Sequence, residues 1–299
     1  MKLLITGAWN CTAKQLEHIK NMGHSVKLIQ YEKDEIKNPS SFDGVICNSL
    51  FLYHDIREFT NLKYIQLTSS GFDRIPMDYI KENNISIFNA RGVYSIPMAE
   101  FAISGVLGLY KQNRFFSKNQ SKHKWIKHRE LIELFGKTVC IVGCGSVGTE
   151  CAKRFSAFGC KVIGTDLFPC ENSSCEQIYP IDELKSLLPQ SDIVIITLPL
   201  AKDTKHLFNK DMLNNCKQGA VLVNIARGAI IDTNALIEAL ANNLGGAVLD
   251  VFEEEPLAED NPLWDMDNVI LTPHNSFVGN RNTVRLFNLI YENLKNYID

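Results

Sequence analysis

The stretch from Gly136 to Asp166 constrains the fold of this 299-residue chain more than any other. A short apolar run, Val139 to Val142, predicts a buried strand and leads directly into the glycine turn GCGSVG at 143–148. An amphipathic run from Val147 to Phe158 predicts a helix, and a second apolar run ends in Asp166. The order of strand, glycine turn, helix, strand and acid is typical of a dinucleotide-binding site.

Each residue of the glycine turn has a physical role in this interpretation. Gly143 permits the tight turn out of the strand, and Gly148 lets the helix pack close to it. Gly145 lets the backbone approach a pyrophosphate without a Cβ in the way. Ser146 and Val147 begin the helix, whose free N–H groups and positive dipole end favour phosphate. The alternative for the motif alone is a glycine turn that binds nothing.

Asp166 predicts which dinucleotide would bind. A carboxylate at the end of the second strand accepts hydrogen bonds from both ribose hydroxyl groups and repels a 2′-phosphate. Leu167 follows it, rather than a basic residue that would pair with such a phosphate. The sequence therefore predicts NAD rather than NADP as the cofactor.

Composition narrows the remaining function classes. The length predicts about two domains, and 45% hydrophobic residues is ordinary for a globular protein. The net charge of −3 is spread over both signs, so we expect neither nucleic acid nor a membrane surface as partner. No apolar run approaches the ~20 residues of a membrane span, and the N-terminal residues turn polar too soon for a signal peptide.

The nine cysteines are scattered without the spacing of metal ligands, so we expect no metal site. Unpaired cysteines of this kind are typical of a reducing cytosol, which predicts a cytoplasmic protein. Cys144 lies inside the glycine turn, where packing is favoured over a role as an oxidation-sensitive thiol.

We call the stretch from Gly136 to Asp166 the fingerprint. Apolar runs alternate with helical patterns before and after it, which predicts parallel sheets with helices on both faces. The predicted strands are Lys2–Thr6, Val26–Ile29, Val45–Cys47, Tyr64–Thr68, Ile85–Phe88, Val139–Val142, Lys161–Thr165, Ile193–Leu198, Ala220–Ile225, Ala247–Val251 and Val269–Thr272. The predicted helices are Thr12–Met22, Ile56–Thr60, Pro76–Lys81, Pro97–Ser117, Val147–Phe158, Asp182–Leu188, Lys210–Asn215, Thr233–Asn242 and Asn280–Ile298. The pattern leaves open whether the last helix caps the second sheet or crosses back to the first.

Three polar residues follow the carboxyl ends of predicted strands, where open parallel sheets bind ligands. They are Arg227, Glu255 and His274. An arginine there can bind a carboxylate through two parallel hydrogen bonds. A histidine exchanges a proton near neutral pH, and a carboxylate partner orients it and favours its charged form. Taken singly, each could equally be a surface charge or a structural hydrogen-bonding group.

The sequence resembles the D-isomer-specific 2-hydroxyacid dehydrogenases over essentially its whole length. The resemblance lies in the fingerprint and in TLPLAKDTKHLF, LVNIARGAIIDTNAL, GAVLDVFEEEPL and LTPHNSF, with QLTSSGFD and NARGVYSIPMAE in the first part. It implies an α/β fold of two doubly wound parallel-sheet domains. A Rossmann NAD domain, residues 98–274, would be inserted into a flavodoxin-like substrate domain, residues 1–97 plus 275–299. The last helix would then cross back, and the chain would be a short form without a regulatory domain.

The resemblance also implies roles for individual residues. His274 would be the acid/base, Glu255 its partner, and Arg227 the group that binds the carboxylate and carbonyl of the substrate. The other implied substrate-binding positions are Ser69, Ser70 and Gly71, through their backbone. The implied cofactor-binding positions, besides the fingerprint with Ser146, Val147 and Asp166, are Leu198, Pro199, Thr204, Ala226 and Asp250.

The implied activity is hydride transfer between NADH and a 2-oxoacid, giving a D-2-hydroxy acid. The apolar loop Asn48–Tyr53, with Leu50 as a candidate substrate contact, favours glyoxylate, hydroxypyruvate or a modest apolar 2-oxoacid, unless the loop is ordinary packing. D-3-phosphoglycerate dehydrogenase is the alternative within enzymes. An NAD-sensing corepressor-like binding protein is the alternative from another class.

A homodimer joined through the NAD domain is also expected. The segment Pro97–Ser117 carries more apolar side chains than one sheet face needs. The stretch after it, with Trp125 and Ile126, resembles the dimer arm of the family. A helix buried within one subunit is the alternative.

Overall fold

The computed structural model describes residues 1–169 and 173–297, which form two compact units. One unit comprises residues 1–94 and 279–299, and the other comprises residues 95–278. Both ends of the chain therefore contribute to the first unit, with the second inserted between them. The domain boundaries predicted at 97/98 and 274/275 lie a few residues from these.

The first unit contains a five-stranded parallel sheet in the order β2-β1-β3-β4-β5. Its strands are β1 (Lys2–Thr6), β2 (Ser25–Ile29), β3 (Gly44–Cys47), β4 (Tyr64–Leu67) and β5 (Ser86–Phe88). Its helices are α1 (Ala13–Asn21), α2 (Met77–Glu82) and α9 (Asn282–Asn296). This strand order is that of the flavodoxin-like fold.

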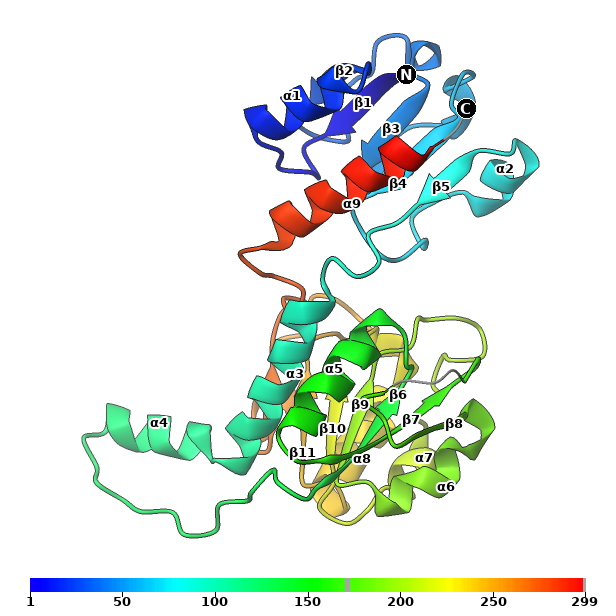
Figure 1. Ribbon diagram of the computed structural model, residues 1–299. Helices are drawn as coiled ribbons and strands as arrows, with labels where there is room; N and C mark the ends of the chain where they lie inside the picture. Colours follow the sequence, from blue (N-terminus) through cyan, green and yellow to red (C-terminus); the bar gives the residue numbers. More distant parts are fainter. Residues whose placement is uncertain (170–172, 298–299) are drawn as a thin grey trace. The chain divides into compact units, whose positions relative to one another are not determined.

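Helix α9, red in Figure 1, lies against the first sheet. Leu286, Ile290 and Leu294 are its buried residues, spaced by one helical turn, and they pack in one cluster with Leu3 and Ile5 of β1. The last helix therefore crosses back to the first unit, which the sequence pattern alone left open.

The second unit contains a seven-stranded parallel sheet in the order β12-β11-β10-β9-β6-β7-β8. Its strands are β6 (Thr138–Val142), β7 (Lys161–Asp166), β8 (Gln177–Pro180), β9 (Ile193–Ile196), β10 (Val221–Asn224), β11 (Gly246–Leu249) and β12 (Val269–Leu271). Its helices are α3 (Ser95–Tyr110), α4 (Asn113–Ser121), α5 (Ser146–Ala157), α6 (Leu184–Leu187), α7 (Lys210–Asn214) and α8 (Thr233–Asn242). The order is that of a Rossmann sheet with one further strand, so the predicted fold class is confirmed.

Both faces of the second sheet are covered. Along β6, Val139 and Ile141 pack with α3 and α5, whereas Cys140 and Val142 pack with α6, α7 and α8. Alternate residues of one strand point to opposite faces, so a strand buried on both faces is a continuous apolar run. That run made the strand recognisable in the sequence.

Several predicted elements differ in detail. The segment Pro97–Ser117 is two helices, because the chain breaks at Gln112, where φ is 54°. Strand β8 was not predicted; it is short and its residues are half-buried or exposed. The remaining short helices are of the 3-10 type: η1 (Pro39–Ser41), η2 (Leu50–Leu52), η3 (Ile56–Glu58), η4 (Ile181–Glu183), η5 (Leu188–Gln190), η6 (Gly228–Ile230) and η7 (Pro262–Trp264). Two predicted helices, Ile56–Thr60 and Asp182–Leu188, thus form wholly or partly as 3-10 turns.

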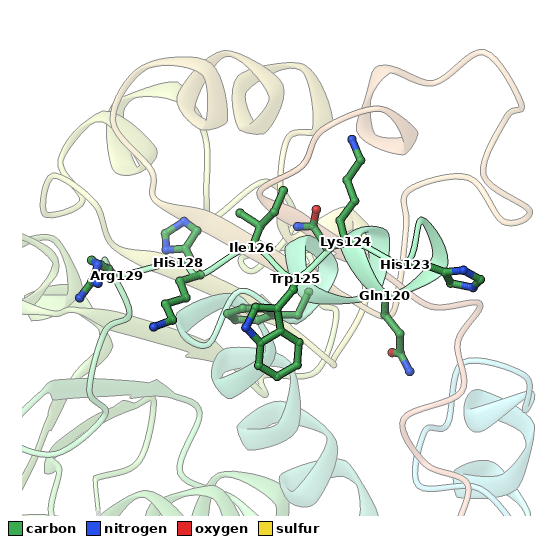
Figure 2. A pocket seen from close by; sticks show the side chains of 10 residues that line it. Gln120, His123, Lys124, Trp125, Ile126, His128 and Arg129 are labelled. Carbon is green, nitrogen blue, oxygen red and sulfur yellow. The ribbon is translucent and has the colours of Figure 1, made fainter.

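Helix α4 and residues 122–135 form an arm that extends away from the second sheet (Figure 1). Most of its large apolar side chains are exposed, whereas Leu134 is buried in the core of the unit. The exposed ones are Phe116, Trp125, Ile126, Leu131, Ile132 and Phe135. Trp125 is 96% exposed and projects from the arm in Figure 2, which shows residues lining a hollow there. In α3, by contrast, Ile103, Val106 and Tyr110 are buried within their own unit. The exposed apolar side chains expected in the segment Pro97–Ser117 therefore lie mainly in the arm.

Candidate active site

The glycine turn after β6 can be built only with glycines at two of its positions. Gly143 has φ 100°, and a Cβ there would lie 2.8 Å from the backbone nitrogen of Leu198. A Cβ on Gly148 would lie 2.1 Å from the carbonyl oxygen of Gly143. Gly143 thus permits the left-handed turn, and Gly148 permits the close approach of α5 to the strand.

Gly145, the middle glycine of the turn, leaves room for a ligand. Gly145 is the N-cap of α5, and a Cβ there would meet no atom within 4 Å. The N–H of Thr149 donates to Gly145 at 2.9 Å, so the earlier N–H groups of the helix, at Ser146 and Val147, have no acceptor within it. Open space before unpaired N–H groups at the positive end of a 12-residue helix fits a pyrophosphate.

Asp166 ends β7 and is held against the same turn. Its Oδ2 accepts a hydrogen bond from the N–H of Cys144 at 2.6 Å, and its Oδ1 accepts one from the N–H of Phe168 at 3.1 Å. A carboxylate has about four lone-pair sites, so acceptor capacity remains for two ribose hydroxyl groups. The residues of the turn and Asp166 therefore fit an NAD molecule.

Cys144 is a buried thiol within the turn. Gly164 makes room for it, since a Cβ on Gly164 would lie 2.4 Å from its Sγ. The hydrogen bond to Cys175 and burial raise the pKa of Cys144 far above its usual range. Because the thiolate is the reactive form, this environment disfavours reaction of Cys144 itself, whereas the same hydrogen bond lowers the pKa of Cys175.

The loop after β9 carries Leu198, Pro199 and Thr204. Leu198 is buried in the core, whereas Pro199 is exposed. Thr204 is buried; its Oγ1 donates to the carbonyl of Pro199 at 2.8 Å and accepts from the N–H of Ala201 at 2.7 Å. Thr204 thus closes the loop, and the proposed contacts of all three residues with the cofactor stay predictions.

Arg227 is carried by a turn that Asn224 holds in place. The side-chain amide of Asn224 donates to the carbonyl of Arg227 at 3.0 Å and accepts from the N–H of Ala226 at 3.1 Å. Asn224 and Ala226 are buried. The only signal of Asn224 in the sequence is a polar residue at the end of an apolar strand.

Adjacent strands bring the three candidate catalytic residues to one edge of the sheet. Strand β11 pairs with both β10 and β12, and Arg227, Glu255 and His274 follow β10, β11 and β12 respectively. The turn of Arg227 also packs directly on the next loop, because a Cβ on Gly228 would lie 1.8 Å from the carbonyl carbon of Phe252. Arg227 and Glu255 therefore stand on loops in backbone contact.

His274 and Glu255 form an ion pair or hydrogen bond. The Nδ1 of His274 lies 2.9 Å from Oε2 of Glu255, whose Oε1 accepts from the N–H of Phe252 at 3.1 Å. A carboxylate can only accept, so Nδ1 carries the hydrogen and Nε2 is the atom left to exchange a proton. The side chains of His274 and Glu255 are 40% and 39% exposed, which leaves the imidazole accessible to a ligand.

Asp250 fixes the backbone around His274. Its carboxyl group is fully buried and accepts three hydrogen bonds: from Thr272 Oγ1 at 2.6 Å, the N–H of Asn275 at 2.7 Å and the N–H of Ser276 at 2.8 Å. The N–H of His274 donates to the carbonyl of Asp250 at 2.8 Å. This positioning role was not predicted, and the implied contacts of Asp250 and Ala226 with the cofactor stay predictions.

In the first unit, the loop after β4 contains Ser69, Ser70 and Gly71. The N–H of Ala90 donates to the carbonyl of Ser69 at 2.8 Å, and the amide of Asn89 donates to the carbonyl of Ser70 at 2.8 Å. These bonds hold the loop on the segment after β5. Its role in binding a carboxylate stays a prediction.

The loop after β3 contains Leu50, for which the sequence left open a substrate contact or ordinary packing. Leu50 is fully buried in the core of the first unit, so the packing alternative describes its side chain. Leu52 and Tyr53 are the exposed side chains of the loop, at 60% and 59%. Leu52 and Tyr53 are therefore the side chains of this loop most accessible to a ligand, and a substrate contact from the loop stays a prediction.

Within the part of the chain that the structure describes, no cluster of three His, Cys, Asp or Glu residues could hold a metal ion. In the same residues, no helix has the length and apolar character that crossing a membrane requires.

A family model describes this site as well. The model for the NAD-binding domain of the D-isomer-specific 2-hydroxyacid dehydrogenases matches residues 103–276. The chain belongs to this family. The matched region contains the glycine turn and Asp166, and it identifies the cofactor of this domain as NAD.

Relatives with named activities align over part of their length. A glyoxylate reductase of Thermofilum pendens is 38% identical over 223 residues, covering 72% of this chain and 65% of that protein. A D-3-phosphoglycerate dehydrogenase of Methanocaldococcus jannaschii is 35% identical over 222 residues, covering 73% of this chain and 42% of that protein. A solved structure, D-lactate dehydrogenase of Aquifex aeolicus complexed with NAD and lactic acid, has a TM-score of 0.79 and 25% identity, covering 98% of this chain and 94% of that one.

Proposed function

We propose that this chain is an NAD-dependent dehydrogenase that interconverts a 2-oxoacid and a D-2-hydroxy acid. The observation that carries the proposal is the His274–Glu255 pair, 2.9 Å apart, on loops next to the Arg227 turn of a family NAD domain. The glyoxylate reductase and lactate-bound dehydrogenase among its relatives support the same reaction class.

The residues have distinct roles in this reaction. The glycine turn binds the pyrophosphate and Asp166 the ribose, and bound NADH supplies the hydride that reduces a carbonyl carbon. Arg227 binds the substrate carboxylate and stabilises the negative charge that grows on the carbonyl oxygen. His274 gives that oxygen a proton from Nε2, while Glu255 holds the ring through Nδ1. Ser69, Ser70 and Gly71 are the proposed substrate contacts of the first unit.

The test is the loss of NADH absorbance with a panel of 2-oxoacids. Turnover of at least one small 2-oxoacid is expected, with far lower kcat/KM when NADPH replaces NADH, because Asp166 would repel the 2′-phosphate. Binding of NADH without turnover of any panel member would instead favour the corepressor-like binding protein. Equal use of both cofactors would contradict the role of Asp166.

We predict that glyoxylate, hydroxypyruvate or a modest apolar 2-oxoacid is reduced well and 3-phosphohydroxypyruvate poorly. The exposed side chains Leu52 and Tyr53 are uncharged or apolar, and the Arg57 guanidinium is already paired with Asp55 at 2.5 Å. A phosphate group requires clustered cations that are free to bind it. If the phosphorylated compound gives the highest kcat/KM of the panel, the chain is a D-3-phosphoglycerate dehydrogenase instead.

We predict a homodimer joined through the arm of the NAD domain. The exposed side chains of Trp125 and Ile126 on the arm are typical of a surface that a partner subunit covers (Figure 2). Sedimentation should show a dimer at micromolar concentration, and Trp125→Ser should shift it toward monomer. Phe168→Ser, at an exposed phenylalanine outside the arm, is the matched control and should leave the dimer intact. A monomeric parent protein would contradict the proposal.

A cytoplasmic location is proposed as well. The cysteines that the structure describes are free thiols, which suits a reducing compartment. Cell fractionation with an antibody against the protein would test this.

A further inference from the structure

The carboxyl group of Glu253 lies where three loops of the second unit meet. Its Oε1 is 2.5 Å from Nε2 of His206, in the loop after β9. Its Oε2 accepts hydrogen bonds from the N–H and Oγ1 of Thr233, at 2.9 Å and 2.5 Å. One side chain thus joins the loop after β11, the loop after β9 and the first turn of α8.

Each of these loops carries part of the candidate active site. The loop of His206 also contains Pro199 and Thr204, and Thr233 follows the turn of Arg227. Backbone bonds already pair the first two loops: the N–H of His206 donates to Ala229 at 2.8 Å, and that of Phe208 donates to Ile230 at 3.0 Å. Glu253 adds the third loop, which carries Glu255.

The bonds of Glu253 are charge-assisted. Burial opposes ionisation, but hydrogen bonds from Thr233 and His206 hold the pKa of Glu253 below its usual range. The side chain is 29% exposed, so solvent screens the interaction only in part. A carboxylate at the N-terminus of α8 is also favoured by the helix dipole.

The backbone conformation of His206 is maintained by hydrogen bonds to residues of other loops. His206 has φ 51°, in the left-handed region, which costs a non-glycine residue about 1 kcal/mol or more. The residue keeps this conformation because its N–H and its ring are both bound, to Ala229 and Glu253. The hydrogen bond between His206 and Glu253 therefore contributes to the shape of the loop after β9.

We propose that Glu253 is a positioning residue. It keeps the loop after β9 (residues 199–208, the cofactor loop), the Arg227 turn and Glu255 in their relative places. This inference rests on the proposed dehydrogenase function. Glu253 acts through the backbone: Gly228 packs against the carbonyl of Phe252, and the N–H of Phe252 donates to Glu255. Loss of its bonds would let the loop shift, and with it the carboxylate that orients His274.

The decisive variant is Glu253→Ala. A shift of about 1 Å in catalytic groups can cost about 100-fold, so we expect kcat to fall about 10- to 100-fold and the KM for NADH to rise. Glu253→Gln can still accept from Thr233, and its amide can donate to Nε2 of His206 when the neutral ring carries its hydrogen on Nδ1, so it should recover a large part of kcat. Glu254→Ala is the matched control, because Glu254 is exposed and forms no hydrogen bond or ion pair with the described residues; its kinetics should stay within about twofold of the parent.

A second variant keeps the test valid if Glu253→Ala fails to fold. His206→Gly removes the hydrogen bond to Glu253, while glycine adopts φ 51° without strain. We expect a higher KM for NADH and faster hydrogen exchange across residues 199–208, with normal global stability. The proposal is overturned if Glu253→Ala, or His206→Gly in its place, keeps kcat and the KM for NADH within about twofold of the parent.

Two readouts separate this proposal from the proposed function. If the parent protein reduces no 2-oxoacid, the proposed reaction fails, while NADH affinity by fluorescence and hydrogen exchange of 199–208 still report the loop. Weaker NADH binding and faster exchange in Glu253→Ala would then support positioning of the cofactor loop, and unchanged values would overturn it.

Discussion

Replacing His274 with asparagine should lower kcat/KM by about 10²- to 10⁴-fold in both directions, the usual contribution of a general acid/base. The variant removes the Nε2 atom that gives a proton to the carbonyl oxygen and takes it back in the reverse reaction. Asparagine is chosen because His274 has φ 51°, a conformation that asparagine tolerates far better than alanine. The loss would therefore reflect chemistry rather than strain.

The measurement is kcat/KM for oxoacid reduction and hydroxy-acid oxidation, together with NADH affinity. Affinity for NADH should change little, since His274 is not among the residues proposed to bind the cofactor. His123→Asn is the matched control: His123 has φ 53° and lies on the arm, so the same chemical change occurs in the same backbone conformation. A loss of less than about tenfold in His274→Asn would remove this residue from the proton-transfer step.

The features that could be predicted from the sequence are those encoded locally. Gly143 is required by its own left-handed φ of 100° and Gly148 by its contact with the carbonyl oxygen of Gly143, and their spacing is therefore visible in the sequence. Strands buried on both faces are continuous apolar runs, which places their carboxyl ends. Because Arg227 and His274 directly follow such runs, their shared edge of the sheet was predictable as well.

The features that could not be predicted depend on groups far apart in the chain. Glu253 binds His206, 47 residues away, and Asp250 binds Ser276, 26 residues away. Nothing in the local pattern distinguishes Glu253 from its exposed neighbour Glu254. The burial of Leu50 was equally hidden, since an apolar loop has the same composition whether it faces a ligand or a core.

Asp250 provides the second large expected effect, on stability as well as on activity. Asp250→Ala would leave the N–H groups of Asn275 and Ser276 and the hydroxyl of Thr272 without their acceptor. A fully buried donor left unpaired costs about 1–3 kcal/mol. Three such donors would cost about 3–9 kcal/mol, but only the N–H of Ser276 is fully buried, so the free energy of unfolding should fall by about 3–6 kcal/mol. Because the same groups flank His274, kcat should fall in whatever fraction remains folded.

Two milder variants separate the contributions. Asp250→Asn can keep the bonds that Oδ1 accepts from Thr272 and Asn275, but it places an N–H₂ against the N–H of Ser276, so an intermediate loss of stability is expected. Thr272→Val removes a single donor and should cost about 1 kcal/mol. Chemical denaturation gives the stabilities. An Asp250→Ala protein within about 1 kcal/mol of the parent would show that water replaces the carboxylate, and the backbone at His274 would then be held by the strand pairing of β11 and β12 instead.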